Sequence, residues 1–357
     1  MHQPKINYAM TSAQNSVWIF SGKSDPHARI VKSALAWIEI NSHLIDSSDF
    51  PVNAQIEHRI EQNSICGGIG EPKNYHQDSD CGVAWIRRPQ QPKTHPRLHA
   101  ADKAFSIAES ESALRGLFYS MELRGIKFIN PILGRTLARY RGVQLEVARI
   151  SGLNIPRTLI SNCPGAVRDF VNEQSRGCVY KTSSPNAWVE ANGDIFQCLT
   201  TAVDCSTLTD DVMVSASPGC YQSLVVKAFD VRALYLNGNL VCAALKSKNF
   251  KLFESDWRAH KPESIDVWPV SAPQSVIDGC RSFAERMGIV FGCFDFVVDA
   301  AGKWFFLEVN EAGQFLFIEY FNPEIKILSP FVEMLISFKG HAACAKSRSL
   351  QLNDFFH

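Results

Sequence analysis

Two short apolar runs near the carboxyl end of the chain constrain its fold more than any other stretch. Residues 294–298 and 304–309 alternate like strands around a turn, a pattern that predicts a β-hairpin. Three polar side chains interrupt the apolar pattern: Asp295, Glu308 and Asn310. Glu308 and Asn310 are two residues apart, so they point to the same face, and pairing with Asp295 would bring three oxygen donors together. Such a set suits Mg²⁺ bound to phosphates, which takes a few carboxylate oxygens and leaves its other positions to phosphate and water.

The alternative is an ordinary amphipathic hairpin with its acids facing water, and such hairpins are common. The position of Glu308 favours the metal site, since it lies between Leu307 and Val309. An unpaired charge on an apolar strand is costly, so this carboxylate needs a partner. We therefore expect the three side chains to form a metal site.

The composition argues against several classes of protein. The chain has 357 residues, enough for two or three subdomains around a substantial core, and its formal net charge is zero. A neutral chain gives no reason to expect nucleic acid or an anionic membrane as a partner. No apolar run is long enough to span a bilayer, and the first residues lack the apolar core of a signal peptide, so we expect a cytoplasmic protein.

Several familiar motifs are missing from the sequence. The eleven cysteines form no C-x-x-C pair, which predicts reduced thiols and gives no support to a structural zinc site. There is no P-loop, no serine-hydrolase elbow and no zincin helix. The glycines at 67–70 lack the strand–helix context of a phosphate loop, so we expect a flexible turn there.

The order of elements is that of a mixed α/β chain. Residues 16–50 read as strand, helix, strand, while residues 51–81 show no clear pattern. Further helices are expected at 110–123, 137–151, 164–171, 276–287 and 327–338, and further strands at 82–89, 177–182, 222–229 and 233–245. An antiparallel sheet is therefore expected to dominate the carboxyl-terminal part.

The hairpin and several other stretches resemble a known family. The D-F at 295–296, followed by E-V-N at 308–310, resembles the metal-binding end of the ATP-grasp fold. The longer E-V-N-E-A-G-Q-F-L-F-I-E is similar to the microviridin-type, or graspetide, peptide maturases, as are V-W-I-F-S-G, V-A-W-I-R-R-P, F-I-N-P and Q-L-E-V-A-R-I-S-G-L-N-I-P-R-T-L-I-S-N. The resemblance covers nearly the whole chain except residues 51–81 and the tail.

This resemblance implies an α+β ATP-grasp fold in four segments. The expected boundaries are 1–127 for a βαβ pre-ATP-grasp domain, 128–220 for a central subdomain, 221–340 for an antiparallel-sheet subdomain with the metal site, and 341–357 for a loosely held tail. It also implies a homodimer, although no interface stripe can be read from the sequence.

By the same resemblance, four residues would contact ATP. Lys181 and Arg141 would bind phosphates, and Gln222 and Lys227 lie in the expected hinge strand that holds the adenine and ribose. Each has a plain alternative. Lys181 could extend to water from a strand end, Arg141 could be a solvated helix residue, Gln222 a hydrogen-bonded strand residue, and Lys227 a partner of Asp230.

Two arginines match the catalytic positions of the family. Arg232 in F-D-V-R and Arg258 in S-D-W-R would stabilise the negative charge that develops during phosphoryl transfer and in the tetrahedral state. The alternative for Arg258 is a surface pair with Asp256. No general base is evident, since His260 reads as a solvated loop residue.

The resemblance predicts an ATP- and Mg²⁺-dependent ligase. It would activate Asp or Glu side chains of a ribosomal precursor peptide as acyl phosphates and join them to Ser, Thr or Lys side chains, forming ester or amide crosslinks. Two alternatives stay open: a ligase that joins two separate molecules, such as a glutamate or dipeptide ligase, and a non-catalytic nucleotide- or peptide-binding module.

Overall fold

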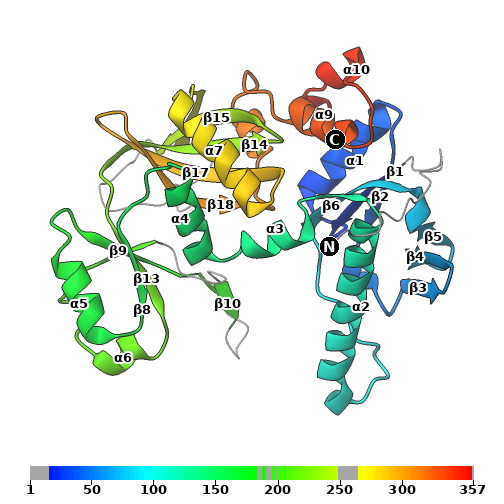
Figure 1. Ribbon diagram of the computed structural model, residues 1–357, viewed down its shortest axis with the longest axis horizontal. Helices are drawn as coiled ribbons and strands as arrows, with labels where there is room; N and C mark the ends of the chain where they lie inside the picture. The colour runs from blue at the N-terminus through cyan, green and yellow to red at the C-terminus, as the bar shows by residue number, and fades with distance from the viewer. Residues whose placement is uncertain (1–15, 183–186, 190–194, 198–199, 248–263, 356–357) are drawn as a thin grey trace, which may run out of the picture. The chain divides into compact units, whose positions relative to one another are not determined.

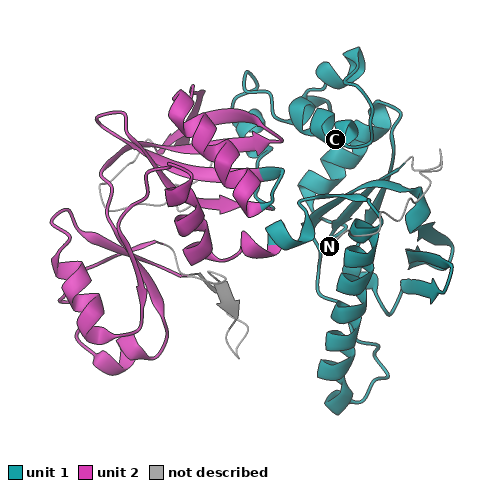
Figure 2. Ribbon diagram, in the orientation of Figure 1, with its two compact units in different colours: residues 1–135, 288–291, 312–357 teal, residues 136–287, 292–311 magenta. Residues whose placement is uncertain are grey.

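The chain divides into two units, each with its own core (Figure 2). Unit 1 comprises residues 1–135, 288–291 and 312–357, and unit 2 comprises residues 136–287 and 292–311. The computed structural model describes residues 16–182, 187–189, 195–197, 200–247 and 264–355 (Figure 1). Unit 1 therefore contains segments from both ends of the chain. The four segment boundaries expected from the sequence stay a prediction.

A four-stranded parallel sheet forms the centre of unit 1. Its order is β2–β1–β6–β7, with β1 at Ser16–Ser21, β2 at Asn41–Ile45, β6 at Cys81–Arg88 and β7 at Lys127–Ile129. Helix α1 (Pro26–Trp37) connects β1 to β2, which confirms the predicted strand–helix–strand unit. Asp25 caps this helix by accepting a hydrogen bond from the Ala28 N–H, and Pro26 occupies its first turn.

Helix α2 (Lys103–Leu123) covers part of this sheet with the apolar stripe expected from the sequence. Its buried side chains include Leu114, Leu117, Phe118 and Met121, which join the core formed by β1 and β6. Phe118 packs edge-on against Phe20 of β1, with ring centroids 4.5 Å apart. The helix is thus held to the sheet by its carboxyl-terminal half.

Residues 51–81, which showed no pattern in the sequence, form a small antiparallel sheet. Its strands are β3 (Gln55–Glu61), β4 (Ser64–Glu71) and β5 (Asn74–Gln77), in that order. The glycines expected to form a flexible turn lie in β4 instead. At Gly68 a Cβ atom would lie 2.4 Å from the carbonyl oxygen of His76, so the close approach of β5 requires glycine.

The carboxyl-terminal segments complete unit 1. They contain α8 (Phe317–Phe321), α9 (Leu328–Ser337), α10 (Ala345–Arg348) and a short 3₁₀ turn at Leu352–Phe355. The amino-terminal part of unit 1 has three further 3₁₀ turns, at Ser47–Asp49, Asp78–Asp80 and Ala100–Asp102. Fully buried rings of Trp85, Phe291, Phe315 and Phe331 pack together, with the Phe315 and Phe331 centroids 4.7 Å apart. The tail, expected to be loosely held, instead buries Leu350 and Leu352 because their apolar side chains join unit 1.

A buried histidine holds the start of this segment. His27 Nε2 accepts hydrogen bonds from the backbone N–H groups of Phe315 and Leu316, at 3.0 and 3.2 Å. Burial, together with the nearby positive charge of Arg87, lowers the pKa of His27 to about 3. The ring is therefore neutral near pH 7 and free to act as an acceptor at Nε2.

The carboxylate of Glu319 plays a similar part further along. Its Oε2 accepts the N–H groups of Ile327 and Leu328 at the start of α9, both at 2.8 Å, and its Oε1 accepts the N–H of Leu352 at 2.9 Å. The side chain is almost completely buried. This glutamate, part of the stretch that resembles the peptide maturases, joins three backbone segments of unit 1.

Glu319→Gln should destabilise the protein by about 1–3 kcal/mol, because one oxygen is replaced by an NH₂ group that cannot accept the Leu352 N–H. Urea unfolding followed by circular dichroism measures the loss. Glu324→Gln, the same change at an exposed position of the following loop, is the matched control. Equal stabilities for the two variants would contradict the role assigned to Glu319.

Unit 2 contains a four-stranded antiparallel sheet with helices on one face. The order is β12–β9–β13–β8, with β12 at Thr201–Val203, β9 at Cys178–Lys181, β13 at Gly219–Ser223 and β8 at Thr158–Ser161. Helices α5 (Pro164–Asn172) and α6 (Asp211–Ser215) cover the face that carries Tyr180 and Tyr221. Strands β10 (Ala187–Val189) and β11 (Ile195–Gln197) form a separate antiparallel pair.

The second sheet of unit 2 has five strands. Its order is β16–β15–β14–β17–β18, with β16 at Ile265–Pro269, β15 at Asn239–Ser247, β14 at Lys227–Leu236, β17 at Phe291–Asp299 and β18 at Trp304–Asn310. Helix α7 (Gln274–Met287) lies across one face, where Phe283 packs against Phe294 and Phe306 (Figure 1). The predicted hairpin is confirmed, and β18 is the edge strand of this sheet.

Two expected elements differ from the observed ones. The helix expected at 137–151 begins only at Arg141 (α4, Arg141–Ile150), after a break at 138–140 that separates it from the short helix α3 (Ile132–Leu137). The strand expected at 222–229 is broken at 224–226, between β13 and β14. The first break places Arg141 at the amino-terminal end of a helix, and the second forms a hinge between the two sheets. In the part of the chain that the structure describes, no helix is long and apolar enough to cross a membrane.

Candidate nucleotide and metal site

A β-bulge in the β17–β18 hairpin determines which side chains face the site. Asp295 pairs with Glu308, but the next residue, Phe296, pairs with Phe306, so β18 carries one extra residue at Leu307. Without the bulge, Phe306 and Glu308 would share a face, because side chains alternate along a strand. The extra residue turns Glu308 away from the aromatic core that buries Phe306.

The backbone hydrogen bonds at the outer edge of β18 show the same one-residue shift in alternation. Phe306 donates its N–H to the carbonyl oxygen of Asn154 at 2.8 Å, so its backbone faces the open edge. In a regular strand the next residue to face that edge would be Glu308. Instead it is Val309 that bonds outward, to the side chain of Gln144. Asp295, Glu308 and Asn310 therefore lie together on the face opposite α7, as the sequence predicted.

Each of the two carboxylates pairs with an arginine. Arg232 Nη1 lies 2.9 Å from Oδ1 and 3.0 Å from Oδ2 of Asp295, and both side chains are largely buried. Arg141 Nη2 lies 2.9 Å from Oε2 of Glu308. Partial burial makes such pairs necessary, since an unpaired charge at these positions would be costly. The predicted catalytic arginine and one predicted phosphate contact thus lie beside the predicted metal ligands.

Lys181 and Gln222 lie on the face of the four-stranded sheet opposite α5 and α6. Lys181 pairs directly with Cys220, and Gln222 lies two residues further along the same strand. Burial raises the pKa of the Cys220 thiol, the positive charges of Arg141 and Lys181 oppose that rise, and the negative charge of Glu308 adds to it. All three charged side chains therefore lie within electrostatic reach of one buried thiol.

Gln222 has an acceptor oriented for a ligand. Its Nε2 donates to Thr158 Oγ1 at 3.0 Å, which leaves Oε1 buried and without a hydrogen-bond partner among the described residues. Two nitrogens of Arg141, Nε and Nη1, are also buried and have no hydrogen-bond partner among the described residues. Unsatisfied buried polar atoms are uncommon and need an explanation such as a missing ligand. A nucleotide fits these groups, because Gln222 Oε1 can accept a hydrogen bond from an amino group of the base and the Arg141 nitrogens can donate to phosphate oxygens.

The remaining predicted residues differ in their surroundings. Lys227 Nζ lies 2.6 and 2.8 Å from the two carboxylate oxygens of Asp230, the pairing that the sequence left open as an alternative to nucleotide contact. Asn310 lies exposed at the end of β18. Arg258 and His260 lie outside the described residues. Contact of Lys227 with a nucleotide stays a prediction.

The donor set fits Mg²⁺ better than a transition metal. Two carboxylates and an amide oxygen are hard ligands, and an incomplete set suits Mg²⁺, which keeps waters and phosphate oxygens in its shell. Among the described residues, no group of three or more His, Cys, Asp and Glu side chains could hold a metal ion by itself. A nucleotide's phosphates would therefore have to complete the coordination.

Gln144 is a site residue that the sequence reading missed. It lies three residues after Arg141 on α4, so both side chains emerge from the same face of the helix. Its amide bonds the backbone of Val309, between two predicted metal ligands. The only available signal was a glutamine at a buried helical position, which by itself does not identify a distant partner.

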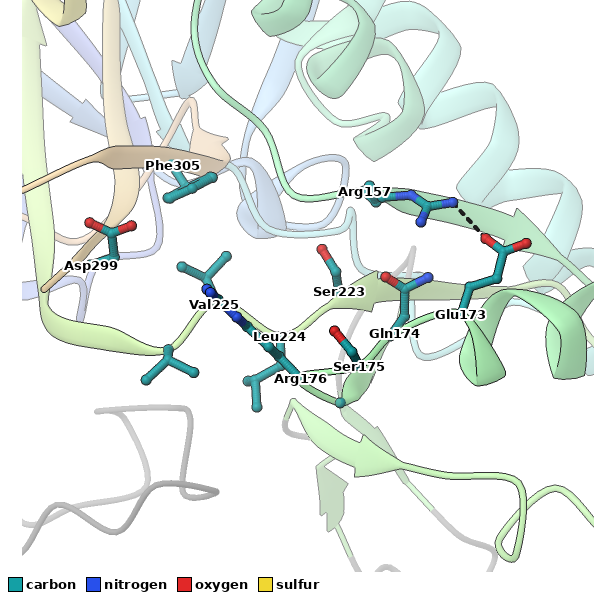
Figure 3. A pocket seen from close by; sticks show the side chains of 12 residues that line it. Arg157, Glu173, Gln174, Ser175, Arg176, Ser223, Leu224, Val225, Asp299 and Phe305 are labelled. Atoms are coloured by element: carbon teal, nitrogen blue, oxygen red, sulfur yellow. Dashed lines mark hydrogen bonds and ion pairs between the residues drawn. The ribbon is translucent and has the colours of Figure 1, made fainter. Parts of the chain in front are cut away.

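A pocket of 310 Å³ lies at the hinge (Figure 3). It is lined by the turn at 173–177, the hinge residues 223–226, Arg157, Asp299 and Phe305. Arg157 and Ser223 are chain neighbours of the hydrogen-bonded Thr158 and Gln222, so they point the opposite way. None of the eight predicted site residues that the structure describes lines this pocket. Phe305, which pairs with Val297, lies on the same face of the five-stranded sheet as Asp295.

The Arg232–Asp295 pair can be tested by a double-mutant cycle. Arg232→Met and Asp295→Asn should each cost about 2–4 kcal/mol of stability, because each removes one partner of a largely buried ion pair. The double variant should lose clearly less than the sum of the two, by at least about 1 kcal/mol in urea unfolding. Strict additivity would contradict a direct pair.

The chain has two antiparallel sheets joined by a hinge, preceded in sequence by a parallel α/β unit. No known protein-family model and no curated protein sequence matches the chain. Solved structures do match. The macrocyclase MdnC of Microcystis aeruginosa MRC, bound with precursor peptide MdnA, has a TM-score of 0.79 at 23% identity, over 90% of this chain and 99% of that chain.

Two further solved structures have a similar fold. A RiPP-associated ATP-grasp ligase of Chryseobacterium gregarium, in complex with ADP and a leader and core peptide, has a TM-score of 0.81 at 18% identity, over 90% of this chain and 97% of that chain. The ATP-grasp ligase PsnB, complexed with a precursor variant, Mg and ADP, has a TM-score of 0.72 at 20% identity, over 92% and 99%. The chain has the ATP-grasp fold, which confirms the fold predicted from the sequence.

Proposed function

We propose that this protein is an ATP- and Mg²⁺-dependent ligase that activates carboxylates as acyl phosphates. The observation that carries the proposal is the cluster formed by the Arg232–Asp295 and Arg141–Glu308 pairs, with Lys181 nearby. These groups offer hard oxygen donors and fixed positive charges on one face of the hairpin. That combination suits a magnesium-bound triphosphate and its transfer chemistry.

Each residue has a defined part in this proposal. Gln222 accepts a hydrogen bond from the nucleotide base through its unpartnered Oε1, while Lys181 and Arg141 bind phosphate oxygens. Asp295, Glu308 and Asn310 hold the metal, and Lys227 contacts the nucleotide at the hinge. Mg²⁺ held by these side chains would supply positive charge that neutralises part of the charge of the phosphates.

The chemistry proceeds in two steps. The γ-phosphoryl group moves from ATP to a carboxylate oxygen, giving an acyl phosphate and ADP. A hydroxyl or amine then attacks the acyl carbon and loses its proton, and inorganic phosphate leaves with the electrons of the broken C–O bond. Arg232, together with Arg258, stabilises the negative charge that builds up on oxygen in both steps.

Arg141 pairs with Glu308, so binding of metal and nucleotide as proposed requires the two side chains to exchange partners. Arg141→Met should therefore strengthen Mn²⁺ binding in the absence of nucleotide by about three- to tenfold, since an ion pair of this exposure contributes roughly 1 kcal/mol. The same change should weaken ATP binding. Electron paramagnetic resonance measures free Mn²⁺, and fluorescent-nucleotide titration measures the second effect.

Arg139→Met is the matched control for this prediction. Arg139 lies two residues before Arg141, is 64% exposed and lies 3.7 Å from Glu311. Its loss should leave Mn²⁺ binding within twofold of the unmodified protein. A weaker affinity for Mn²⁺ in Arg141→Met would contradict the exchange of partners.

For the substrate, we propose a ribosomal precursor peptide whose Asp or Glu side chains become linked to Ser, Thr or Lys side chains. Support comes from the sequence similarity to peptide maturases and from the solved structures of similar fold, several of which were determined with precursor peptides. We also propose that the protein acts in the cytoplasm as a homodimer, which light scattering would test.

The decisive experiment is the intact mass of a precursor peptide after incubation with the protein, ATP and Mg²⁺. Loss of one or more waters, with equal release of ADP, is expected. Glu308→Gln should abolish ADP release with an unchanged circular dichroism spectrum, because it removes a metal-binding charge. Normal turnover by this variant would contradict the metal assignment.

A ligase that joins two separate molecules is the second candidate. The D-cycloserine synthetase DcsG has the same fold, with a TM-score of 0.54 at 13% identity over 91% of this chain, so the fold extends beyond the peptide-associated ligases. A gain in product mass would favour this candidate. Nucleotide binding without any ADP release would favour a non-catalytic module.

A further inference from the structure

The outer edge of strand β18 has no neighbouring strand among the residues that the structure describes, and side-chain and backbone groups of other segments bond to it instead. β18 is the last strand of its sheet, so its outward N–H and C=O groups need other partners. The side-chain amide of Gln144 bonds both the N–H and the C=O of Val309. Its Oε1 accepts the Val309 N–H at 2.8 Å, and its Nε2 donates to the Val309 carbonyl oxygen at 3.0 Å. The amide thus replaces one residue of a missing strand.

A second clamp lies on the other side of the bulge. The backbone carbonyl of Asn154 accepts the Phe306 N–H at 2.8 Å, and Asn154 Nδ2 donates to the Trp304 carbonyl oxygen at 3.2 Å. Gln144 and Asn154 therefore hold β18 on either side of the extra residue at Leu307. The bulge cannot move along the strand without breaking one of these sets of bonds.

The position of Gln144 gives this clamp a consequence for the site. Val309 lies between Glu308 and Asn310, so fixing both backbone groups of Val309 fixes the direction of the two side chains that flank it. A shift of β18 by one residue would turn those side chains toward the core, because strand side chains alternate. Gln144 is also anchored itself, since its Nε2 donates to the Ala138 carbonyl oxygen at 2.5 Å and the residue is buried.

From this geometry we infer that Gln144 is a positioning residue for the metal site: its amide keeps Glu308 and Asn310 aimed at the nucleotide face. The inference rests on the proposed function, since it concerns the metal of that same site. Residues that orient metal ligands typically contribute a factor of about 10–100 to metal affinity. The clamp acts on the ligand strand and leaves the nucleotide contacts of Gln222 and Lys181 untouched.

Gln144→Met should weaken Mn²⁺ binding in the presence of ADP by about 10–100-fold, because the unbranched side chain fills the space but forms neither bond to Val309. Binding of fluorescent ADP in the presence of EDTA should change by less than twofold. Electron paramagnetic resonance of free Mn²⁺ supplies the first measurement. A purely structural role would not produce this difference between the two affinities.

Gln144→Glu separates the hydrogen bonds from electrostatics. Glutamate keeps the size and the acceptor for the Val309 N–H, but it loses the donors. Its added negative charge would by itself strengthen binding of a cation, so weaker Mn²⁺ binding can come only from the lost clamp. This variant keeps the inference testable if Gln144→Met fails to fold.

Leu145→Ala is the control for general loss of stability. Leu145 is the next residue of α4 and is equally buried, and its truncation should cost about 2–5 kcal/mol of stability while leaving the amide of Gln144 in place. Its Mn²⁺ affinity should stay within twofold of the unmodified protein. Equal weakening in Leu145→Ala, or stronger Mn²⁺ binding in Gln144→Glu, would overturn the inference.

The unmodified protein distinguishes this inference from the proposed function. If it binds Mn²⁺ together with ADP and Gln144→Met binds as tightly, the positioning role fails while the metal site stands. If the unmodified protein binds no Mn²⁺ with ADP, the metal site and the inference that depends on it both fail.

Discussion

Two carboxylates on a hairpin with an aromatic core impose the main constraint on unit 2. Asp295 and Glu308 lie on strands whose other face buries Phe294, Phe296 and Phe306, so neither charge is tolerated without compensation. Compensation comes from Arg232 and Arg141, each within 3 Å of its partner. Positioning Arg141 requires α4 to begin beside the hairpin, which in turn places Gln144 against the edge of β18. The arrangement of several elements thus follows from two partly buried charges.

The bulge at Leu307 allows the Phe306 ring to be buried while the Glu308 carboxylate faces away from the core. A regular strand would have to place Phe306 and Glu308 on one face, either exposing a large aromatic ring or burying a charge. The extra residue allows both to be satisfied at the expense of one unpaired ladder position. The hydrogen bonds of Gln144 and Asn154 on either side of the bulge hold the extra residue in place.

Much of the fold could be predicted from local pattern. The alternating runs of the hairpin, the stripe of α2 and the capped start of α1 depend on neighbours in sequence, so propensity and periodicity identify them. Strand β4 could not be predicted in this way, because its glycines read as a turn and only the close approach of β5 explains them. The burial of Leu350 and Leu352 likewise depends on a core assembled elsewhere in the chain.

The sequence by itself determined which chemical groups are available: Asp295, Glu308 and Asn310 at the hairpin, Lys181 and Gln222 on strand patterns, and arginines beside them. Alternation alone placed Glu308 and Asn310 on one face, and the register of the hairpin, with its bulge, brought Asp295 to the same face. The tertiary structure decided how they are held. Arg141 and Glu308 are 167 residues apart, and Gln144 and Val309 are 165 residues apart, so no local pattern connects them. Hydrogen bonds and ion pairs act over about 3 Å in space, whereas sequence patterns report only the spacing along the chain.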